Sequence, residues 1–373
     1  MKKIKIKELQ YKYNKNIVYL AMLPLIFFGK IIRYTIMKQV LVDTSIGHSM
    51  LVQINNNNTP FSFLTEEGTS AATGNATWLF HFFKIFGFAT YTEYEILITI
   101  IWNILLLILL RKSYRKLTSG QTFWLMLSIV VLNIFDFNLA KEPVQMLYFI
   151  ALFYIITTKY FSIKQKYILS IFMILFSTLT YRAYYILILF FAVELWILFK
   201  FFSRKGKSVR LKQVLIMLVI LTFTYYILLR VCQIVSPTTF AELFRVRTRT
   251  STAASDMRVI FQSNNLIIFC MDYLIMLIRM LFPIELLRLG IKYFPYVLYQ
   301  LTISLNIINA MINKKKNDEE QNLALYIYLG FLLASGTFEP DFGSWVRHEA
   351  VCFPIFLIIN NMVRVKRREK KYE

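Results

Sequence analysis

Cysteine is scarce in this chain, and the few cysteines form no recognisable pattern. Three are present, Cys232, Cys270 and Cys352, and they lie far apart and outside any CxxC arrangement. An odd number at these spacings excludes the usual cysteine-based metal centres. We therefore expect the three thiols to be small apolar side chains in or near helices.

The sequence also lacks the marks of a soluble protein or of a β-barrel. No composition shift marks a domain boundary, no internal repeat is visible, and low complexity is limited to Asn55–Asn58. Hydrophobic residues make up 57% of the chain, aromatic residues 17%, and the mean hydropathy is +0.53. The apolar runs are continuous rather than alternating, which is typical of membrane-spanning helices and not of barrel strands. The sequence predicts an all-α, polytopic transmembrane helical bundle that forms a single integral membrane domain over residues 1–373.

Acidic residues are few: 21 Asp and Glu stand against 43 Lys and Arg, which gives a net charge of +22. Such an excess can indicate nucleic-acid binding, but twenty-eight of these basic residues fall in six short blocks that flank apolar runs. This distribution is the positive-inside pattern of membrane proteins, and basic blocks also attract anionic membrane lipids. We predict no nucleic-acid partner. The blocks, all assigned to the cytoplasm, are 1–16, 111–116, 159–166, 200–212, 314–316 and 364–373.

Counting apolar runs between these blocks gives a topology with both termini in the cytoplasm. Ile17–Ile36 follows six lysines but lacks a small-residue cleavage site, so it is predicted to be an uncleaved first span. Trp78–Phe88 is aromatic and only moderately long, and it is predicted to be an interfacial helix on the outer face of the membrane. Leu266–Pro283 is predicted to be a re-entrant or surface-lying element, because two cytoplasmic blocks must be separated by an even number of spans. The predicted spans, about ten, are Ile17–Ile36, Glu95–Leu110, Leu117–Phe135, Pro143–Thr158, Tyr167–Tyr181, Ala183–Phe199, Val214–Val231, Tyr296–Ile312, Leu323–Thr337 and Ala350–Val363.

With this topology, most of the unusual polar residues lie at the outer ends of spans. They form an elbow at Asp136–Glu142, an isolated arginine at Arg182, an arginine-rich loop at Phe244–Arg258 and a charged segment at Gly336–Pro354. A charged side chain at the centre of a bilayer costs ~2.5–3.5 kcal/mol on insertion scales, so these groups cannot face lipid. A transporter more often places its charges midway along spans. The one-sided distribution therefore favours chemistry at the outer face on a membrane-borne substrate.

The basic residues among these groups suit an anionic headgroup. Arg182 lies about sixteen residues along a helix from Lys166, or ~24 Å, which places it just below the outer boundary of a ~30 Å hydrocarbon core. Alternating arginines from Arg245 onwards would point the same way on an extended backbone, and guanidinium groups bind phosphate or pyrophosphate well. Snorkelling of Arg182 to the headgroups and a plain solvated basic loop are the alternatives. The predicted substrate-binding residues are Arg182, Arg245, Arg247, Arg249, Arg258, Arg347 and Lys141.

His348 is the candidate base of the charged segment, because a histidine can take up a proton near neutral pH. Glu349 follows it directly, but adjacent residues on a helix do not face each other, so a more distant carboxylate can be its partner. Two carboxylates at Glu339 and Asp341 do not make a metal site by themselves, and we predict no metal. The predicted catalytic residues are His348, Glu349, Asp341 and Glu142.

A recessed Arg182 needs a counter-charge, and the carboxylates near the outer membrane level are few. We therefore expect Arg182 and the segment 339–349 to share one outer cavity with the Asp136–Glu142 elbow. In this arrangement the arginines pair with the carboxylates, and His348 is left free as a base.

These features together resemble the bacterial repeat-unit polymerases of capsule, exopolysaccharide and O-antigen pathways. The resemblance rests on the many spans, the Lys141-Glu142-Pro143 elbow, the Arg182–Tyr185 apex, the arginine-rich external loop, and Arg347-His348-Glu349 just before the last span. Related lipid-linked glycosyltransferases usually carry an Asp-x-Asp-like motif in the first external loop. This chain has only Asp43 and Glu66-Glu67 there.

The resemblance implies that both substrates are oligosaccharides on undecaprenyl pyrophosphate, and that one glycan moves to a hydroxyl of the other. The lipid pyrophosphate is already an activated leaving group, so no cofactor is implied. Arginines would stabilise the departing pyrophosphate, and a base would take the proton of the acceptor hydroxyl. A flippase and a chain-length regulator are the implied protein partners, and the bacterial cytoplasmic membrane is the implied location. Another lipid-linked glycosyl or acyl transferase and a lipid-oligosaccharide flippase or transporter stay open as alternatives.

Overall fold

The regular elements of the computed structural model are helical throughout the residues that it describes. These are 2–37, 44–59, 61, 63, 71–112, 117–202, 210–237, 255–257, 260–261, 265–312, 317–339 and 341–363. Within these ranges no strand occurs, and an isolated backbone bridge joins Asp256 to Asp341. The predicted all-α fold is confirmed. The chain divides into two compact units, unit 1 (Met1–Ala183 with Arg347–Glu373) and unit 2 (Tyr184–Val346).

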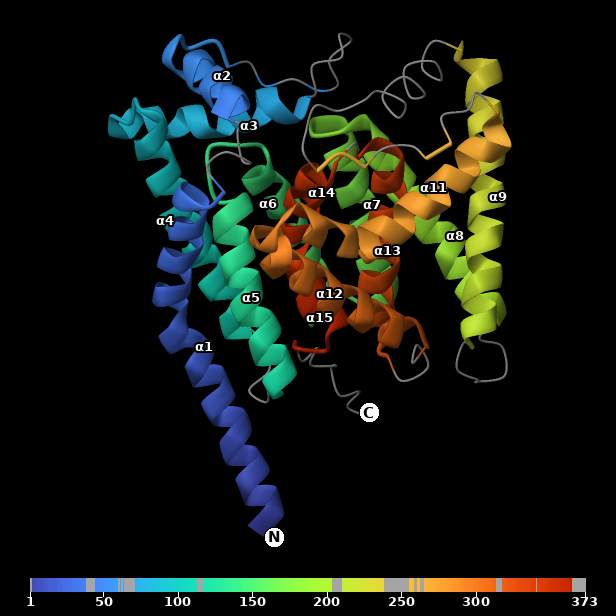
Figure 1. Ribbon diagram of the computed structural model, residues 1–373, viewed down its shortest axis with the longest axis horizontal. Helices are drawn as coiled ribbons and strands as arrows, with labels where there is room; N and C mark the ends of the chain where they lie inside the picture. Colours follow the sequence, from blue (N-terminus) through green and yellow to red (C-terminus); the bar gives the residue numbers. More distant parts are fainter. Residues whose placement is uncertain are drawn as a thin grey trace. The chain divides into compact units, whose positions relative to one another are not determined.

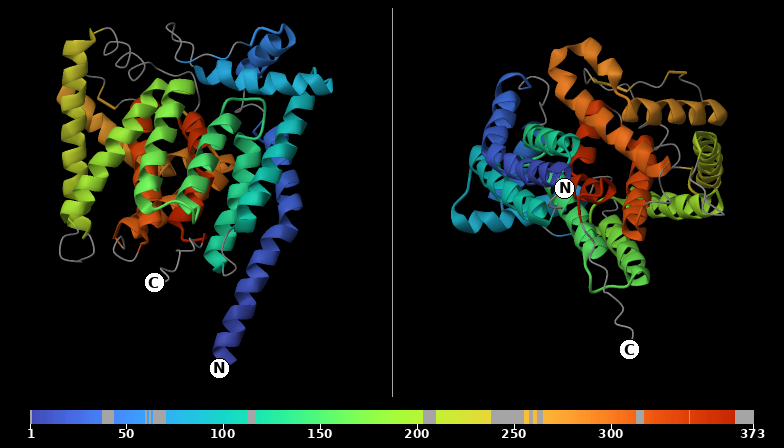
Figure 2. Two further views of the ribbon diagram at one scale, coloured as in Figure 1. Left: turned by 180° about the vertical axis from the view of Figure 1, so that it is seen from behind. Right: turned by 90° about the horizontal axis from the view of Figure 1, so that it is seen from below.

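Unit 1 combines helices from both ends of the chain. The C-terminal α15 (Phe353–Ile359) packs against α6 (Glu142–Thr157), and α1 (Lys2–Thr35) runs along α5 (Ser119–Phe135) in the views of Figures 1 and 2. Glycine at residue 29 of α1 permits this close approach, because a Cβ there would lie 2.9 Å from Cβ of Asn133. The remaining elements of unit 1 are α2 (Thr44–Asn55), α3 (Ala71–His81), η1 (Phe82–Phe86), α4 (Tyr91–Lys112) and α7 (Ile163–Thr180).

Local sequence explains where the helices around the elbow begin. Thr118 and Gln121 form a capping box at the start of α5, in which each side chain accepts from the other residue's backbone N–H. Ser162 does the same at the start of α7. Helix α6 begins with Glu142 and Pro143. A carboxylate is favoured at the positive end of a helix, and a proline loses no intrahelical hydrogen bond there.

Unit 2 is organised around α13 (Glu319–Phe338), whose residues from Asn322 to Thr337 are all buried. A helix that is apolar on every side is stable only when its neighbours cover it. Helix α8 (Ile186–Phe202) lies against it so closely that a Cβ at residue 330 would be 2.5 Å from the carbonyl oxygen of Ile188, which only glycine avoids. The other elements are α9 (Leu211–Val235), α11 (Leu266–Leu281), η4 (Ile284–Leu289), η5 (Ile291–Tyr293) and α12 (Phe294–Ile312); η2 (Ala183–Tyr185) and α14 (Phe342–Ala350) have residues in both units.

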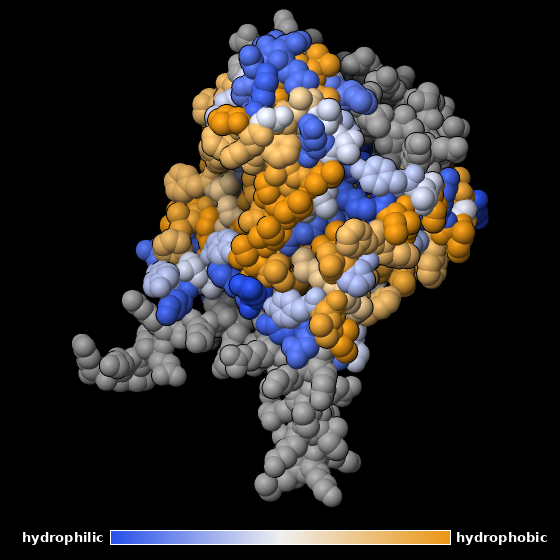
Figure 3. Space-filling view, turned by 90° about the vertical axis from the view of Figure 1, so that its left-hand side faces the viewer, coloured by the Kyte–Doolittle hydropathy of each residue, from blue (hydrophilic) through white to orange (hydrophobic). Residues whose placement is uncertain are grey.

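Apolar helices give the chain the character of a multi-pass membrane protein. Four helices in the described ranges are long and apolar enough to cross a membrane: Asn14–Thr35, Tyr91–Lys112, Ala183–Phe202 and Lys212–Val235. Large apolar side chains such as Phe27 on α1 and Ile100 on α4 are exposed. The face that carries these helices shows apolar residues in its middle part and hydrophilic residues above and below them (Figure 3). A fifth span results if α14 and α15 are counted together. The predicted count of about ten spans is not confirmed.

The C-terminal part of the chain is bent where we expected one continuous span. The prediction ran one span from Ala350 through Pro354, whereas α14 and α15 are separate helices bent by 65°. The break falls at Cys352, which is the N-cap residue of α15, and Pro354 occupies the first turn. A proline has no N–H to bond to a preceding turn, so a helix more readily begins there than continues through it.

Candidate functional site

Three of the predicted site residues meet in unit 1. An Nη atom of Arg182 lies 2.7 Å from Nε2 of His348, and a carboxylate oxygen of Glu142 lies 3.5 Å from the same nitrogen. Glu142 is the first residue of α6, Arg182 follows the end of α7, and His348 belongs to α14. The predicted contact of Arg182 and His348 with the elbow is therefore present, whereas one outer cavity shared with the whole segment 339–349 stays a prediction.

The Glu142–His348 contact is shielded from solvent. The side chains of His348 and Glu142 are 6% and 2% exposed, and Arg182 is half-buried. Burial alone raises the pKa of Glu142, but the contact with His348 and the positive charges of Arg347 and Lys141 outweigh it and hold the pKa below its usual range. Glu142 is thus a carboxylate at neutral pH.

Gln145 and Tyr181 link the backbone segments that carry the site. Gln145 lies one turn after Glu142 on α6, and its amide nitrogen donates to the backbone oxygen of His348 at 3.4 Å. The buried Tyr181 hydroxyl lies 3.3 Å from both the Gln145 side-chain oxygen and the Lys141 backbone oxygen, so it can donate to either. The guanidinium of the next residue, Arg182, lies over the Tyr181 ring at 5.5 Å from its centroid. These two residues therefore link the backbone of α14 to the start of α6 and place an aromatic ring beside the Arg182 guanidinium.

Nε2 of His348 has two partners that require opposite protonation states. A guanidinium can only donate, so the contact with Arg182 requires a lone pair on Nε2. A carboxylate can only accept, so a hydrogen bond to Glu142 requires a proton on Nε2. The contact with Arg182 needs the tautomer of His348 whose Nε2 carries no proton, whereas a hydrogen bond to Glu142 needs a proton on that nitrogen, so the two contacts exclude each other. We expected His348 to be left free as a base, but its basic nitrogen is covered by Arg182.

The other predicted residues have different surroundings. Arg347 is half-buried and acts through its charge on Glu142, and Glu349 is fully buried. Asp341 lies in unit 2 and accepts from the backbone N–H of Ser344 at 2.8 Å and from its hydroxyl at 3.1 Å. These contacts cap the first turn of α14. The predicted pyrophosphate-binding residues Arg245, Arg247, Arg249 and Arg258 lie outside the described residues.

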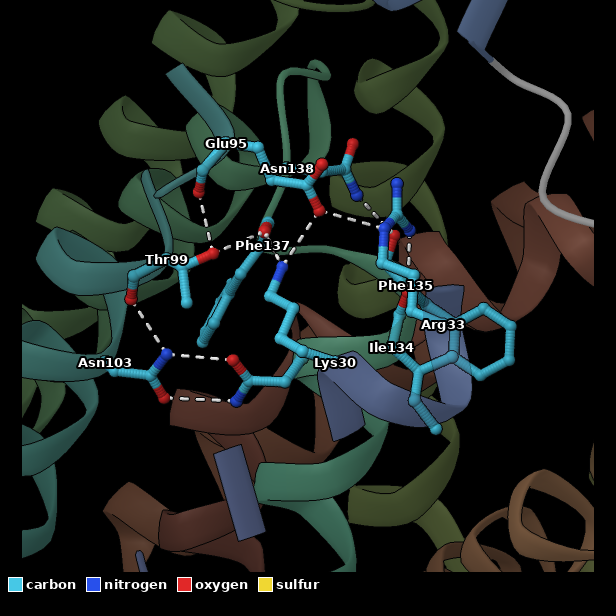
Figure 4. Close-up of polar contacts among 10 residues, drawn as sticks. Lys30, Arg33, Glu95, Thr99, Asn103, Ile134, Phe135, Phe137 and Asn138 are labelled. Atoms are coloured by element: carbon cyan, nitrogen blue, oxygen red, sulfur yellow. Dashed lines mark hydrogen bonds and ion pairs between the residues drawn. The ribbon is translucent and has the colours of Figure 1, made fainter. Parts of the chain in front are cut away.

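A second buried ionic network in unit 1 was missed from the sequence (Figure 4). Glu95 on α4 pairs with Lys30 at 3.1 Å and with Arg33 at 3.0 Å, both on α1. Lys30 also donates to the backbone oxygen of Phe137 at 2.6 Å, and Arg33 donates to that of Ile134 at 2.7 Å. The network therefore ties α1 and α4 to the start of the elbow. The sequence did carry a signal for this network: Lys30 and Arg33 lie near the end of one apolar run, and the oppositely charged Glu95 lies at the start of the next.

The arrangement offers an imidazole, a carboxylate and a guanidinium within reach of one another at the ends of three helices. Such a set can accept a proton and stabilise an anion. No protein-family model, curated protein or solved structure matches the chain. The chemistry of the site is therefore the main basis for its function.

Proposed function

We propose that this chain is a membrane glycan polymerase, which transfers an undecaprenyl-pyrophosphate-linked oligosaccharide to another lipid-linked repeat unit at the outer face of the bacterial cytoplasmic membrane. One observation carries the proposal: three buried carboxyl groups of unit 1, with cations beside them, lie at one set of helix ends. The residues are Lys30 and Arg33 near the end of α1, Glu95 near the start of α4, Asp136 after α5, Glu142 at the start of α6 and Arg182 after α7. If these helices alternate in direction across the membrane, all of these ends lie on one face. Charges midway along the spans would instead favour a transporter.

The geometry suits a transfer in which one proton moves. The bound donor pyrophosphate first draws Arg182 away from Nε2 of His348. The acceptor hydroxyl oxygen then attacks the anomeric carbon of the donor glycan, and the uncovered Nε2 takes the hydroxyl proton. The bond from the anomeric carbon to the pyrophosphate oxygen breaks, and its electron pair leaves with the lipid pyrophosphate. Protonated His348 then donates to Glu142, and the released Arg182 is available to the new negative charge. Base and anion-binding functions are coupled in this scheme, because both use the same imidazole nitrogen.

The membrane arrangement is part of the proposal. In it the chain has about ten spans, both termini are cytoplasmic, and α3 with η1 lies along the outer face as an interfacial helix. Exposed aromatic residues such as Trp78 and Phe82 are consistent with that position. Arg347, Lys141 and the four arginines of the loop 244–258 add positive charge for pyrophosphate.

A cysteine at the exposed position Asn57 is expected to react with an impermeant thiol reagent in intact cells. Tyr160→Cys is the matched control, since Tyr160 is also exposed and lies within the basic block 159–166, which is assigned to the cytoplasm. That cysteine should react only after the cells are broken. Labelling of the unaltered chain gives the background from the three native cysteines. Protection of residue 57 in intact cells would overturn the arrangement.

Loss of the gene is expected to remove long surface glycan and to leave lipid-linked single repeat units on the outer face. The measurement is the length distribution of the glycan, together with analysis of extracted lipid-linked sugars. Restoring the gene should restore long chains, whereas a copy with His348→Gln should not. A length distribution unchanged by the deletion would contradict the proposal. Accumulation of the repeat units on the inner face would indicate a flippase instead.

A further inference from the structure

Asp136 is the most unusual buried carboxyl of unit 1. It follows α5 directly at the start of the elbow and is completely buried. Its backbone is well bonded, since its N–H donates to Leu132 at 2.9 Å and its carbonyl oxygen accepts from the N–H of Asn138 at 2.8 Å. Both carboxyl oxygens, however, lack a hydrogen-bond partner among the residues that the structure describes. An ionised carboxylate is very unfavourable in such a position unless cations or N–H groups bind it.

The cations near Asp136 are committed to other groups. Lys30 and Arg33 bind the carboxylate of Glu95 and the backbone oxygens of Phe137 and Ile134. Arg347 acts through its charge on Asp136 and also on Glu142. Glu142, at the other end of the elbow, is the carboxylate that contacts His348. A second negative charge in the same dry elbow would repel the first.

We propose that the Asp136 carboxyl carries a proton and forms, with Glu142, an acid–base pair that holds one proton between the two ends of the elbow. Burial raises the pKa of Asp136 well above its usual range, and the charge of Glu142 adds to this against the charges of Arg347, Arg33 and Lys30. The environment of Glu142 lowers its pKa instead. Two carboxyl groups with opposite shifts divide into an acid and a base. This inference does not depend on the substrate of the chain.

Occupancy of this proton site sets the charge of the whole cluster. Asp136 faces Lys30 and Arg33 on α1, Glu142 on α6 and Arg347 on α14, and it also influences the Cys352 thiol together with Glu349. Loss of the proton would place a new negative charge among them. Because the folded-state pKa is raised, neutral Asp136 contributes stability below its ordinary pKa, and this stability is lost as the pH rises through the folded value.

Infrared spectroscopy of the full-length protein in lipid tests this proposal, because a protonated carboxyl has a carbonyl stretch that a carboxylate lacks. The chain has six aspartates, so carboxyl-¹³C aspartate shifts their bands and leaves those of glutamate in place. We expect an isotope-sensitive acid band at neutral pH that disappears in Asp136→Asn. It should persist in Asp272→Asn, the matched control, since Asp272 is also buried and one of its oxygens accepts from the N–H of Ile260 at 3.1 Å.

A second variant keeps the test decisive if Asp136→Asn does not fold. Glu142→Gln removes the charge that opposes ionisation of Asp136, so the acid band should disappear at a lower pH than in the unaltered protein. Absence of an aspartic acid band at neutral pH would overturn the proposal. So would a band that vanishes in Asp272→Asn, or one whose titration ignores Glu142→Gln.

Discussion

Replacing His348 with glutamine is expected to lower the rate of glycan transfer by ~10²–10⁴-fold, the usual contribution of a positioned base. Glutamine keeps a polar side chain that can accept a hydrogen bond from Arg182 and donate one to Glu142. It cannot take up a proton from the acceptor hydroxyl. The loss should therefore appear in the transfer rate of protein reconstituted with lipid-linked donor and acceptor. The free energy of unfolding should change much less.

His48→Gln is the matched control for this substitution. His48 is exposed, lies against the ring of Tyr91 at 5.4 Å between centroids, and has no role in the proposed transfer. Its replacement should leave the transfer rate unchanged.

His348→Ala adds a test of packing, because it removes the imidazole from a buried position and leaves Glu142 with one partner fewer. If His348→Gln transferred glycan at the unaltered rate, His348 would be a structural residue and the base would have to be sought elsewhere.

Much of the helical architecture could be predicted because continuous apolar runs fix where a chain can bury itself in a membrane. The run Glu95–Leu110 lies within α4, and Pro143–Thr158 differs from α6 by one residue at each end. The ends were less predictable. Helix α1 extends back to Lys2, since lysines are good helix formers even where the charge block ends the apolar run. The bend at Cys352 depends on how a proline is used, and the sequence does not show whether it begins a helix or kinks one.

The sequence was enough to predict which charged residues form the candidate site, because their charges must be balanced near the membrane. Arg182, Glu142 and His348 could be grouped because charges at the ends of apolar helices must find partners. The particular atoms could not be inferred. Whether Nε2 of His348 is open or covered depends on where the Arg182 guanidinium lies, which the sequence does not specify. The pairing of Glu95 with Lys30 was missed because it joins residues that are 65 positions apart, and opposite signs alone do not specify which helices are neighbours.

The largest expected loss of stability comes from removing Glu95. Glu95 is 2% exposed, and its partners Lys30 and Arg33 are 15% and 11% exposed. Glu95→Gln keeps the shape of the side chain but leaves two largely buried cations without their carboxylate. Breaking a buried ion pair in this way costs ~3–5 kcal/mol in free energy of unfolding, because the remaining charge has lost its compensation in a medium of low dielectric. The measurement is equilibrium unfolding of the purified protein in mixed micelles.

A triple variant separates charge from packing. Combining Glu95→Leu with Lys30→Met and Arg33→Met removes all three charges and keeps side chains of similar length, so most of the lost stability should return. Full recovery is not expected, since the backbone oxygens of Phe137 and Ile134 also lose the donors that now bind them at 2.6 and 2.7 Å. Glu93→Gln is the control, because Glu93 is an exposed carboxylate two residues away that accepts from the backbone N–H groups of Ala89 and Thr90 at the start of α4. If Glu95→Gln unfolded like the unaltered chain, water would have to reach the network. If the triple variant were no more stable than Glu95→Gln, the network would hold α1 and α4 to the elbow by shape rather than by charge.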